Sequence, residues 1–166
     1  MAFFFWLILW VAAAASFATS LPQVQIPPEG RFAAVNGMRM YYEEYGQGEP
    51  LVLLHGFFGS SGAWKPVIPE FAKHYRLVVP DLRGHGRTNN PTEEFTHRQS
   101  ALDVFGLLDR LGIPTARAMG ISTGGMTLIH MATREPSRLE AVVLIGATIY
   151  FPDEARAIMT RSTSSR

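Results

Sequence analysis

Short apolar runs constrain the fold of this chain more than any other feature of its sequence. Three of them have the length of one strand: LVLLH at 51–55, RLVVP at 76–80 and AVVLIG at 141–146. Runs without polar alternation are typical of strands buried on both faces. TARAM, at 115–119, is predicted to form a further strand.

Segments with helical periodicity separate these strands. They predict helices at 63–75, 95–111 and 123–134. An alternation of strand and helix favours parallel pairing, so the sequence predicts an α/β fold with a mostly parallel sheet and helices on both faces. Ahead of the first apolar run, residues 31–45 are predicted to form a β-hairpin, because Asn36-Gly37 favours a type I′ turn.

Composition excludes several classes of function. The chain has 166 residues, is 47% hydrophobic and carries a net charge of +1, as expected of one globular domain. Its charges are mixed in sign and form no basic stripe, so no nucleic acid partner is expected. It contains no cysteine, which rules out disulfides, thiolate catalysis and cysteine-ligated metals.

The first 29 residues are expected to lie outside the core, which we predict to span residues 30–151. An apolar run at 2–15 leads into small and polar residues, a pattern typical of a signal peptide over residues 1–20, although no Lys or Arg precedes the run. This predicts a secreted or periplasmic protein. The alternative is that this segment is an uncleaved membrane anchor, and only in that case is the protein expected to contact a membrane. Residues 21–29, rich in proline, are expected to be a linker.

The stretch GISTGG, from Gly120 to Gly125, surrounds Ser122 with glycines between a predicted strand and a predicted helix. In that setting Gly-x-Ser-x-Gly is a nucleophile elbow, a turn so tight that residues beside the serine must lack bulk. Gly120 and Gly124 are expected to allow the close approach, and Gly125 to let the helix pack on the sheet. The pattern makes Ser122 the candidate nucleophile.

A second motif, HGFFGS, follows the strand predicted at 51–55. A sharp turn at Gly56 would direct the backbone amide of Phe57 into the crevice above the sheet. The amide of Thr123, at a helix N-terminus, would point to the same place. Two such donors form an oxyanion hole. His55 is expected to brace the loop by hydrogen bonding and to have no catalytic role.

A third motif, DLRGHGRT, follows the strand predicted at 76–80 and contains Asp81, Arg83, Gly84, His85 and Gly86. One aspartate and one histidine are too few ligands for a metal site. We therefore expect a buried network of ion pairs and hydrogen bonds that holds this loop. No metal or cofactor is implied.

With these three motifs, the chain resembles the N-terminal half of an α/β-hydrolase of the serine esterase and lactonase type. The resemblance covers about residues 30–150 and includes His-Gly, Asp-x-Arg-Gly-His-Gly and Gly-x-Ser-x-Gly-Gly in the expected order. It implies a sheet that stops after about its sixth strand. Thr88 stands where the family usually has serine. Serine at the elbow argues against the haloalkane dehalogenase and epoxide hydrolase branches, and the lack of His-Gly-Gly-Gly against the hormone-sensitive-lipase-like branch.

The other two members of a catalytic triad are harder to find. The family order is serine, acid, histidine, and His130 is the only histidine after Ser122. It lies about 12 Å further along the same predicted helix, too far to accept the serine proton. Asp153 is a weak candidate for the acid, because most relatives place it one strand later. Residues 152–166 are expected to begin a lid or an irregular tail.

These observations predict a serine-dependent hydrolase of an ester, lactone or similar acyl bond, which forms an acyl-enzyme on Ser122. The expected partner is a small-molecule acyl substrate. The chain is expected to be a fragment without its catalytic histidine. The alternative is a non-catalytic α/β-hydrolase-like protein that binds a small molecule or a partner.

Overall fold

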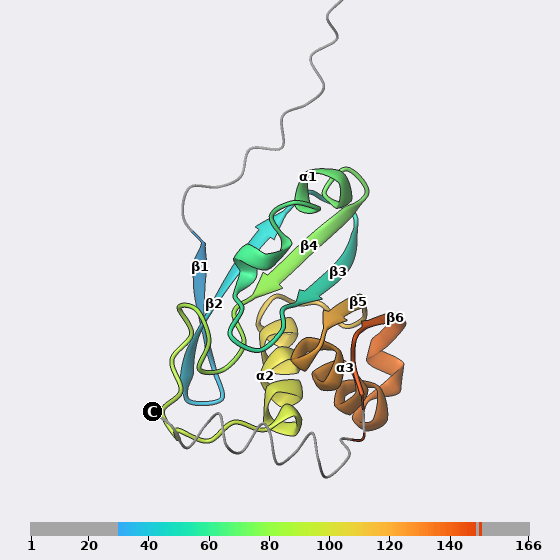
Figure 1. The fold of residues 1–166 in the computed structure, drawn as a ribbon. Coiled ribbons are helices and arrows are strands. Elements are labelled where there is room, and N and C mark those ends of the chain that lie inside the picture. Colours follow the sequence, from blue (N-terminus) through green and yellow to red (C-terminus); the bar gives the residue numbers. More distant parts are fainter. Residues whose placement is uncertain (1–29, 149, 151–166) are drawn as a thin grey trace, which may run out of the picture.

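The computed structural model describes residues 30–148 and 150. Six strands form one sheet in the order β1-β2-β4-β3-β5-β6. Figure 1 shows β1 at one end of this sheet and β6 at the other. The strands are β1 (Arg31–Val35), β2 (Met38–Tyr45), β3 (Glu49–Leu54), β4 (Tyr75–Pro80), β5 (Ala116–Ile121) and β6 (Leu139–Ile145).

The sheet is mostly parallel. β4, β3, β5 and β6 pair in parallel, whereas β2 is antiparallel to both β1 and β4. The predicted hairpin is present: Val35 pairs with Met38, and the turn residues Asn36 and Gly37 have φ angles of 45° and 77°. The α/β fold with a mostly parallel sheet, predicted from the sequence, is confirmed.

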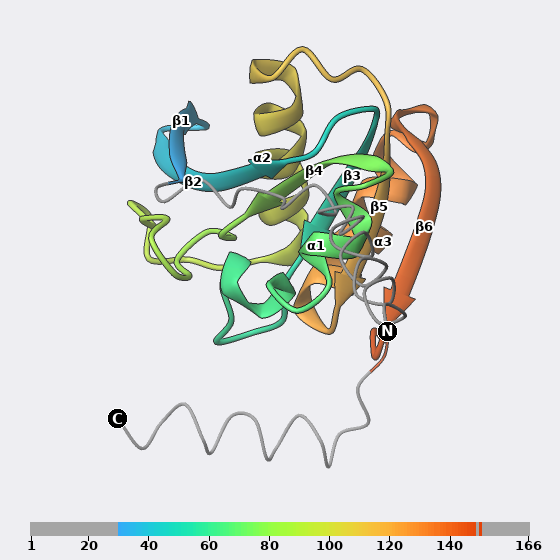
Figure 2. The same ribbon diagram turned by 90° about the horizontal axis from the view of Figure 1, so that it is seen from above.

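Helices cover the two faces of the sheet unequally. The longer ones, α2 (His97–Arg110) and α3 (Thr123–Arg134), pack in one hydrophobic cluster with Val52 and Leu54 of β3. On the opposite face, Leu51 and Leu53 pack against Trp64 and Ile68, from the 3₁₀ helix η1 (Ser61–Trp64) and the short helix α1 (Ile68–Phe71). Alternate residues of β3 thus contribute to two cores, as its apolar run predicts. Figure 2 shows α2 and α1 on opposite sides of the sheet. A second 3₁₀ helix, η2 (Pro136–Arg138), precedes β6.

The continuous helix predicted at 63–75 is wrong. η1 ends at Trp64, and α1 contains only four residues with a proline in its first turn. Pro66 and Pro69 explain the difference, because proline inside a helix lacks the amide hydrogen and its ring collides with the carbonyl four residues earlier. Proline is tolerated in a first turn, and there the structure places Pro69.

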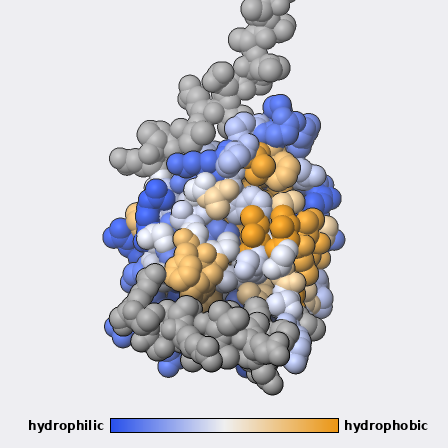
Figure 3. All heavy atoms as spheres, in the orientation of Figure 1, coloured by the Kyte–Doolittle hydropathy of each residue, from blue (hydrophilic) through white to orange (hydrophobic). Residues whose placement is uncertain are grey.

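The outer side of β6 is apolar and exposed. Val143, Leu144 and Ile145 are 46%, 46% and 43% exposed, and among the described strands β6 pairs only with β5. Figure 3 shows hydrophobic side chains gathered on this side of the molecule. In the part of the chain that the structure describes, no helix is long and apolar enough to span a membrane.

Candidate active site

Ser122 lies at the junction between β5 and α3, with φ 49° and ψ −114°. A positive φ is uncommon for any residue other than glycine and is a strained conformation for serine. Two backbone hydrogen bonds hold it: the Ser122 amide donates to the carbonyl of Ile145 at 2.8 Å, and its carbonyl accepts from the Met126 amide at 2.9 Å. The serine is therefore fixed by β6 on one side and by α3 on the other.

Glycines permit this turn because its backbone segments almost touch. A Cβ atom added to Gly124 would lie 2.6 Å from the carbonyl carbon of Leu54, and one on Gly120 would lie 2.5 Å from the carbonyl carbon of Gly124. A Cβ on Gly125 would lie 2.6 Å from the Cβ of Ala147. Non-bonded contacts of a Cβ atom are not this short in real proteins, so α3 approaches β3 and β5 this closely only because these positions have no side chain.

The loop after β3 lies directly against the serine. A Cβ atom on Gly56 would be 3.5 Å from the Cβ of Ser122, an ordinary van der Waals contact. Phe57 follows Gly56, and Thr123 is the first residue of α3, where its side chain is buried. Of the two residues predicted to supply amide donors, Thr123 thus follows Ser122 in the sequence, and Phe57 follows the glycine that lies against Ser122.

His55 is fully buried and uses both ring nitrogens. Its Nδ1 lies 2.7 Å from the carbonyl oxygen of Gly56, and its Nε2 accepts from the amide of Leu82 at 2.9 Å. These contacts assign the ring hydrogen to Nδ1. Burial lowers the pKa of His55 and favours the neutral ring. His55 therefore ties the loop after β3 to the loop after β4.

Asp81 is also fully buried and connects three segments. Its Oδ1 accepts from the Ser61 amide at 2.6 Å and its Oδ2 from the Arg87 amide at 2.8 Å. The Thr88 hydroxyl donates to the Asp81 carbonyl at 2.7 Å and accepts from the Tyr41 amide at 2.9 Å. Threonine thus supplies the hydroxyl that this position requires.

The remaining glycines of the third motif shape this loop. Gly84 and Gly86 have φ angles of 70° and 54°. A Cβ atom on Gly86 would lie 2.5 Å from the Cγ of Asp81. The chain therefore bends around the buried carboxylate at a point where a side chain does not fit.

Arg83 forms a buried ion pair whose partner the sequence analysis missed. Its Nε and Nη2 donate to Asp103 of α2 at 2.7 and 2.9 Å, and both side chains are almost completely buried. Asn36 and Gln99 also donate to this carboxylate. An aspartate on the apolar face of a predicted helix was the available signal, because buried carboxylates require partners.

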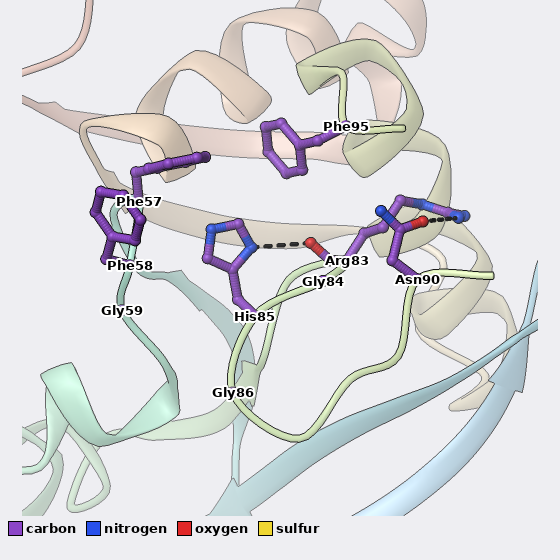
Figure 4. A pocket seen from close by; sticks show the side chains of 9 residues that line it. All are labelled: Phe57, Phe58, Gly59, Arg83, Gly84, His85, Gly86, Asn90 and Phe95. Atoms are coloured by element: carbon purple, nitrogen blue, oxygen red, sulfur yellow. Dashed lines mark hydrogen bonds between the residues drawn. The ribbon is translucent and has the colours of Figure 1, made fainter. Parts of the chain in front are cut away.

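His85 is the centre of an aromatic cluster near the candidate nucleophile. Its Nδ1 lies 2.8 Å from the Arg83 carbonyl oxygen, a hydrogen bond visible in Figure 4. Its ring contacts Phe57 and Phe95 edge to face, with centroids 5.1 and 5.4 Å away. Phe95, just before α2, did not stand out in the sequence. The third motif thus positions aromatic side chains as well as charges.

No base is visible beside Ser122 within the described residues, where its hydroxyl forms no hydrogen bond to another side chain. His130 is exposed on α3. Its ring lies parallel to that of His97, with the ring centroids 6.4 Å apart. Asp153, the candidate acid, lies outside the described residues. Across residues 30–148 and 150, no three histidine, aspartate or glutamate side chains form a group that could hold a metal ion.

Comparison with known proteins identifies the class to which this geometry belongs. The family model of the alpha/beta hydrolase fold matches residues 49–162. This chain belongs to the alpha/beta hydrolase fold family.

Individual relatives include enzymes of different specificity. The chain is 36% identical over 113 residues to a soluble epoxide hydrolase of Corynebacterium sp. (strain C12), covering 68% of this chain and 40% of the relative. It is 35% identical over 131 residues to a 2-hydroxymuconate semialdehyde hydrolase of Pseudomonas sp. (strain CF600), covering 76% and 46%. The enol-lactonase of Burkholderia xenovorans LB400 superposes with a TM-score of 0.76 at 30% identity, over 82% of this chain and 54% of that one.

These relatives are hydrolases that act on small molecules, and the chain spans about half of their length. The chain is similar to both an epoxide hydrolase and a lactonase, so the comparison does not show which reaction it catalyses. The exclusion of the epoxide hydrolase branch depends on Ser122 alone and stays a prediction.

Proposed function

We propose that this chain carries the nucleophile of a serine hydrolase that cleaves an ester, lactone or similar acyl bond. Ser122 gives its proton to a base and attacks the acyl carbon, and the acyl C–O bond breaks as the alcohol oxygen takes up that proton. An ester then releases its alcohol, whereas an opened lactone keeps the hydroxyl on its acyl chain. Water finally releases the acid from the acyl-enzyme. The substrate is a small molecule, and the cycle requires no metal or cofactor. The similarity to an enol-lactonase supports this choice of bond.

The observation that carries the proposal is the backbone of Ser122. Its φ of 49° is strained, and glycines whose Cβ atoms would overlap neighbouring backbone surround it. Strain of this kind costs free energy and persists where the surrounding structure enforces it, most often at functional sites. A serine held in this way at the end of a strand presents its hydroxyl to a substrate above the sheet.

Two amides are proposed to stabilise the negative oxygen that forms during attack. Gly56 lies against the Cβ of Ser122, so the next amide, that of Phe57, belongs to the same small region. The Thr123 amide starts α3, where the helix dipole favours negative charge. A fixed pair of donors of this kind is usually the largest electrostatic contribution in acyl transfer.

A histidine base and an acid complete the proposed mechanism, and neither is found among the described residues. We propose that both belong to the part of the fold that relatives of twice the length contain. Asp153 is a weaker candidate for the acid. Without a base, a serine hydroxyl at neutral pH remains protonated and reacts slowly.

A non-catalytic role is the second candidate. The absence of a histidine beside Ser122 within the described residues favours it, because a binding protein needs no base. In that case the chain would hold a small molecule or a partner without cleaving it. The strained serine argues against this candidate.

Labelling with a fluorophosphonate probe tests the proposal. The chain alone should label slowly, since loss of the histidine from a serine protease triad costs about 10⁶-fold in turnover. Fusion of the C-terminal half of the enol-lactonase relative, which this chain does not cover, should raise labelling by orders of magnitude. Ser122→Ala should abolish this gain, while Ser137→Ala, at an exposed serine in η2, should retain it.

Two results would change the assignment. If the fusion folds but labels no faster than the chain alone, the non-catalytic role is correct. If the chain alone labels rapidly through Ser122, a base lies within it, and His55, His85 and His130 are the side chains to replace. Asp153→Asn in the fusion tests the candidate acid, because loss of the true acid should slow labelling strongly.

We further propose that residues 1–20 direct export and are removed. Small residues favour cleavage after Ala18 or Ser20, so mature protein should begin at Thr19 or Leu21. The intact mass of exported protein measures this directly. Retention of Met1 in a membrane fraction would instead support the anchor.

A further inference from the structure

An open hollow of about 300 Å³ lies between the loop after β3 and the loop after β4. Figure 4 shows Phe57, Phe58, His85 and Phe95 around it, with Arg83 and Asn90 on the far side. Glycine backbone at 59, 84 and 86 completes the lining. The walls are therefore mainly aromatic rings and main chain.

The charge in this lining is already compensated. Arg83 is the one lining residue with a permanent charge, and two of its nitrogens donate to the buried carboxylate of Asp103 at 2.7 and 2.9 Å. Its Nη1 points to the Asn90 side-chain oxygen, 3.4 Å away. An anionic ligand would have to compete with a buried bidentate ion pair, which disfavours it. The lining thus favours an uncharged group.

Three rings of the lining contact one another edge to face. The centroids of Phe57 and His85 lie 5.1 Å apart, those of His85 and Phe95 5.4 Å, and those of Phe57 and Phe95 5.9 Å, with interplanar angles of 68° to 75°. Rings in this arrangement present both faces and edges to a guest. Aromatic guests gain from such geometry beyond the area that they bury, by about 2- to 12-fold in affinity.

The hollow shares a loop with the contact to the candidate nucleophile, although Ser122 itself does not line it. Phe57 lines it with its side chain, and the preceding residue, Gly56, lies against the Cβ of Ser122. A group in the hollow would therefore lie beside the same loop that contacts Ser122. A cavity of about 150 Å³ holds a benzene molecule, so about 300 Å³ accommodates one or two fused rings.

We propose that this hollow binds an uncharged aromatic ring of the substrate, between the rings of Phe57, His85 and Phe95. The inference rests on the proposed function, since it names the substrate class of the same site. Aromatic esters or lactones should then be better ligands than saturated ones of the same size and polarity.

Binding of two matched amides tests this without requiring catalysis. N-methyl-2-naphthamide and its fully saturated decahydro analogue have the same polar group and similar shape, and neither reacts with a serine. Both are titrated by NMR into the full chain, with and without Ser122→Ala. The naphthamide should bind about 2- to 12-fold more tightly in both proteins. Phe95→Leu should reduce this preference, because only Phe57 and His85 remain, while Phe32→Leu, at a half-exposed phenylalanine on β1, should leave it unchanged.

The outcomes separate this inference from the proposed function. Equal affinity for the two amides, or binding of neither, overturns the aromatic site whatever Ser122 does. A clear preference together with unlabelled Ser122 in the fused protein supports the site and refutes the hydrolase. If Phe95→Leu fails to fold, intermolecular NOEs in the unmodified chain decide: naphthyl protons should contact ring protons of Phe57 and Phe95, and contacts elsewhere would contradict the proposal.

Discussion

The loop at 81–88 and the elbow at 120–125 both follow parallel strands, but different forces hold them. Side-chain hydrogen bonds fix the loop: Asp81, Arg83 and Thr88 are buried and each has partners. The elbow contains no such network. Close backbone packing around glycines fixes Ser122 instead.

This difference affects how each region should respond to substitution. Substitutions in a hydrogen-bond network lower the free energy of unfolding in steps, because each lost partner leaves a defined number of unsatisfied groups. In the elbow, backbone packs against backbone, so an added side chain would meet atoms that cannot rotate out of its way. We therefore expect substitutions in the elbow to cost the most, and substitutions in the loop to form a graded series.

The largest effect is expected for Gly124→Ala. Alanine is favoured over glycine inside a helix by about 1 kcal/mol, yet its Cβ would overlap the backbone of Leu54. Separation of α3 from β3 should lower the free energy of unfolding by more than about 4 kcal/mol. Urea denaturation measures it. Gly112→Ala is the control, since its Cβ meets nothing within 4 Å and its positive φ costs about 1–2 kcal/mol. A larger loss at Gly112 would refute the packing argument.

A smaller loss is expected when the buried ion pair is broken. Asp103→Ala leaves the guanidinium of Arg83 buried without its partner and should cost about 3–5 kcal/mol. Asp109→Ala, on the same helix, removes a carboxylate that is 63% exposed from Arg138, which keeps the carbonyls of Ile113 and Pro114 as acceptors, and should cost about 0–1 kcal/mol. Both are measured by urea denaturation. Equal losses would mean that burial does not determine the strength of these pairs.

The sequence was sufficient to predict the regions that local chemistry determines. Apolar strands, the turn at Asn36-Gly37 and the glycines around Ser122 are each readable from a few neighbouring residues. The helix predicted at 63–75 is wrong because Pro66 and Pro69 prevent a continuous helix there.

Partners distant in the sequence could not be predicted. Arg83 and Asp103 are twenty residues apart and meet only when α2 packs on the sheet. The cluster of Phe57, His85 and Phe95 likewise joins two separate loops, because Phe57 follows β3 whereas His85 and Phe95 lie between β4 and α2. A charge or a ring in the sequence shows that a partner is needed, and the fold determines which residue supplies it.

A still smaller loss of stability is expected when the Thr88 hydroxyl is removed from the hydrogen-bond network of the loop at 81–88. Thr88→Val keeps the shape but removes the hydroxyl that accepts from the Tyr41 amide and donates to the Asp81 carbonyl. We expect a loss of about 1–3 kcal/mol, because a buried amide loses its acceptor. Thr88→Ser keeps both bonds and removes one methyl group, which should cost about 0.8 kcal/mol. Urea denaturation of both variants gives the order, and a larger loss for serine would show that packing dominates there.

The smallest effect is expected at the histidine pair that joins α2 to α3. Burial, and to a lesser degree the nearby His130, lower the pKa of His97 below its usual value. A histidine with a lowered pKa stays neutral in the folded state while the unfolded chain takes up a proton, so its contribution to stability is present above about pH 6.5 and is lost as the pH falls through the folded pKa. NMR titration of the His97 ring measures that pKa. His130→Ala should raise it only in part, because burial is the larger cause, and His74→Ala, at the turn before β4, should leave it unchanged. Full recovery to the usual value in His130→Ala would make charge repulsion, not burial, the dominant cause, and the two helices would then be coupled by pH through this pair.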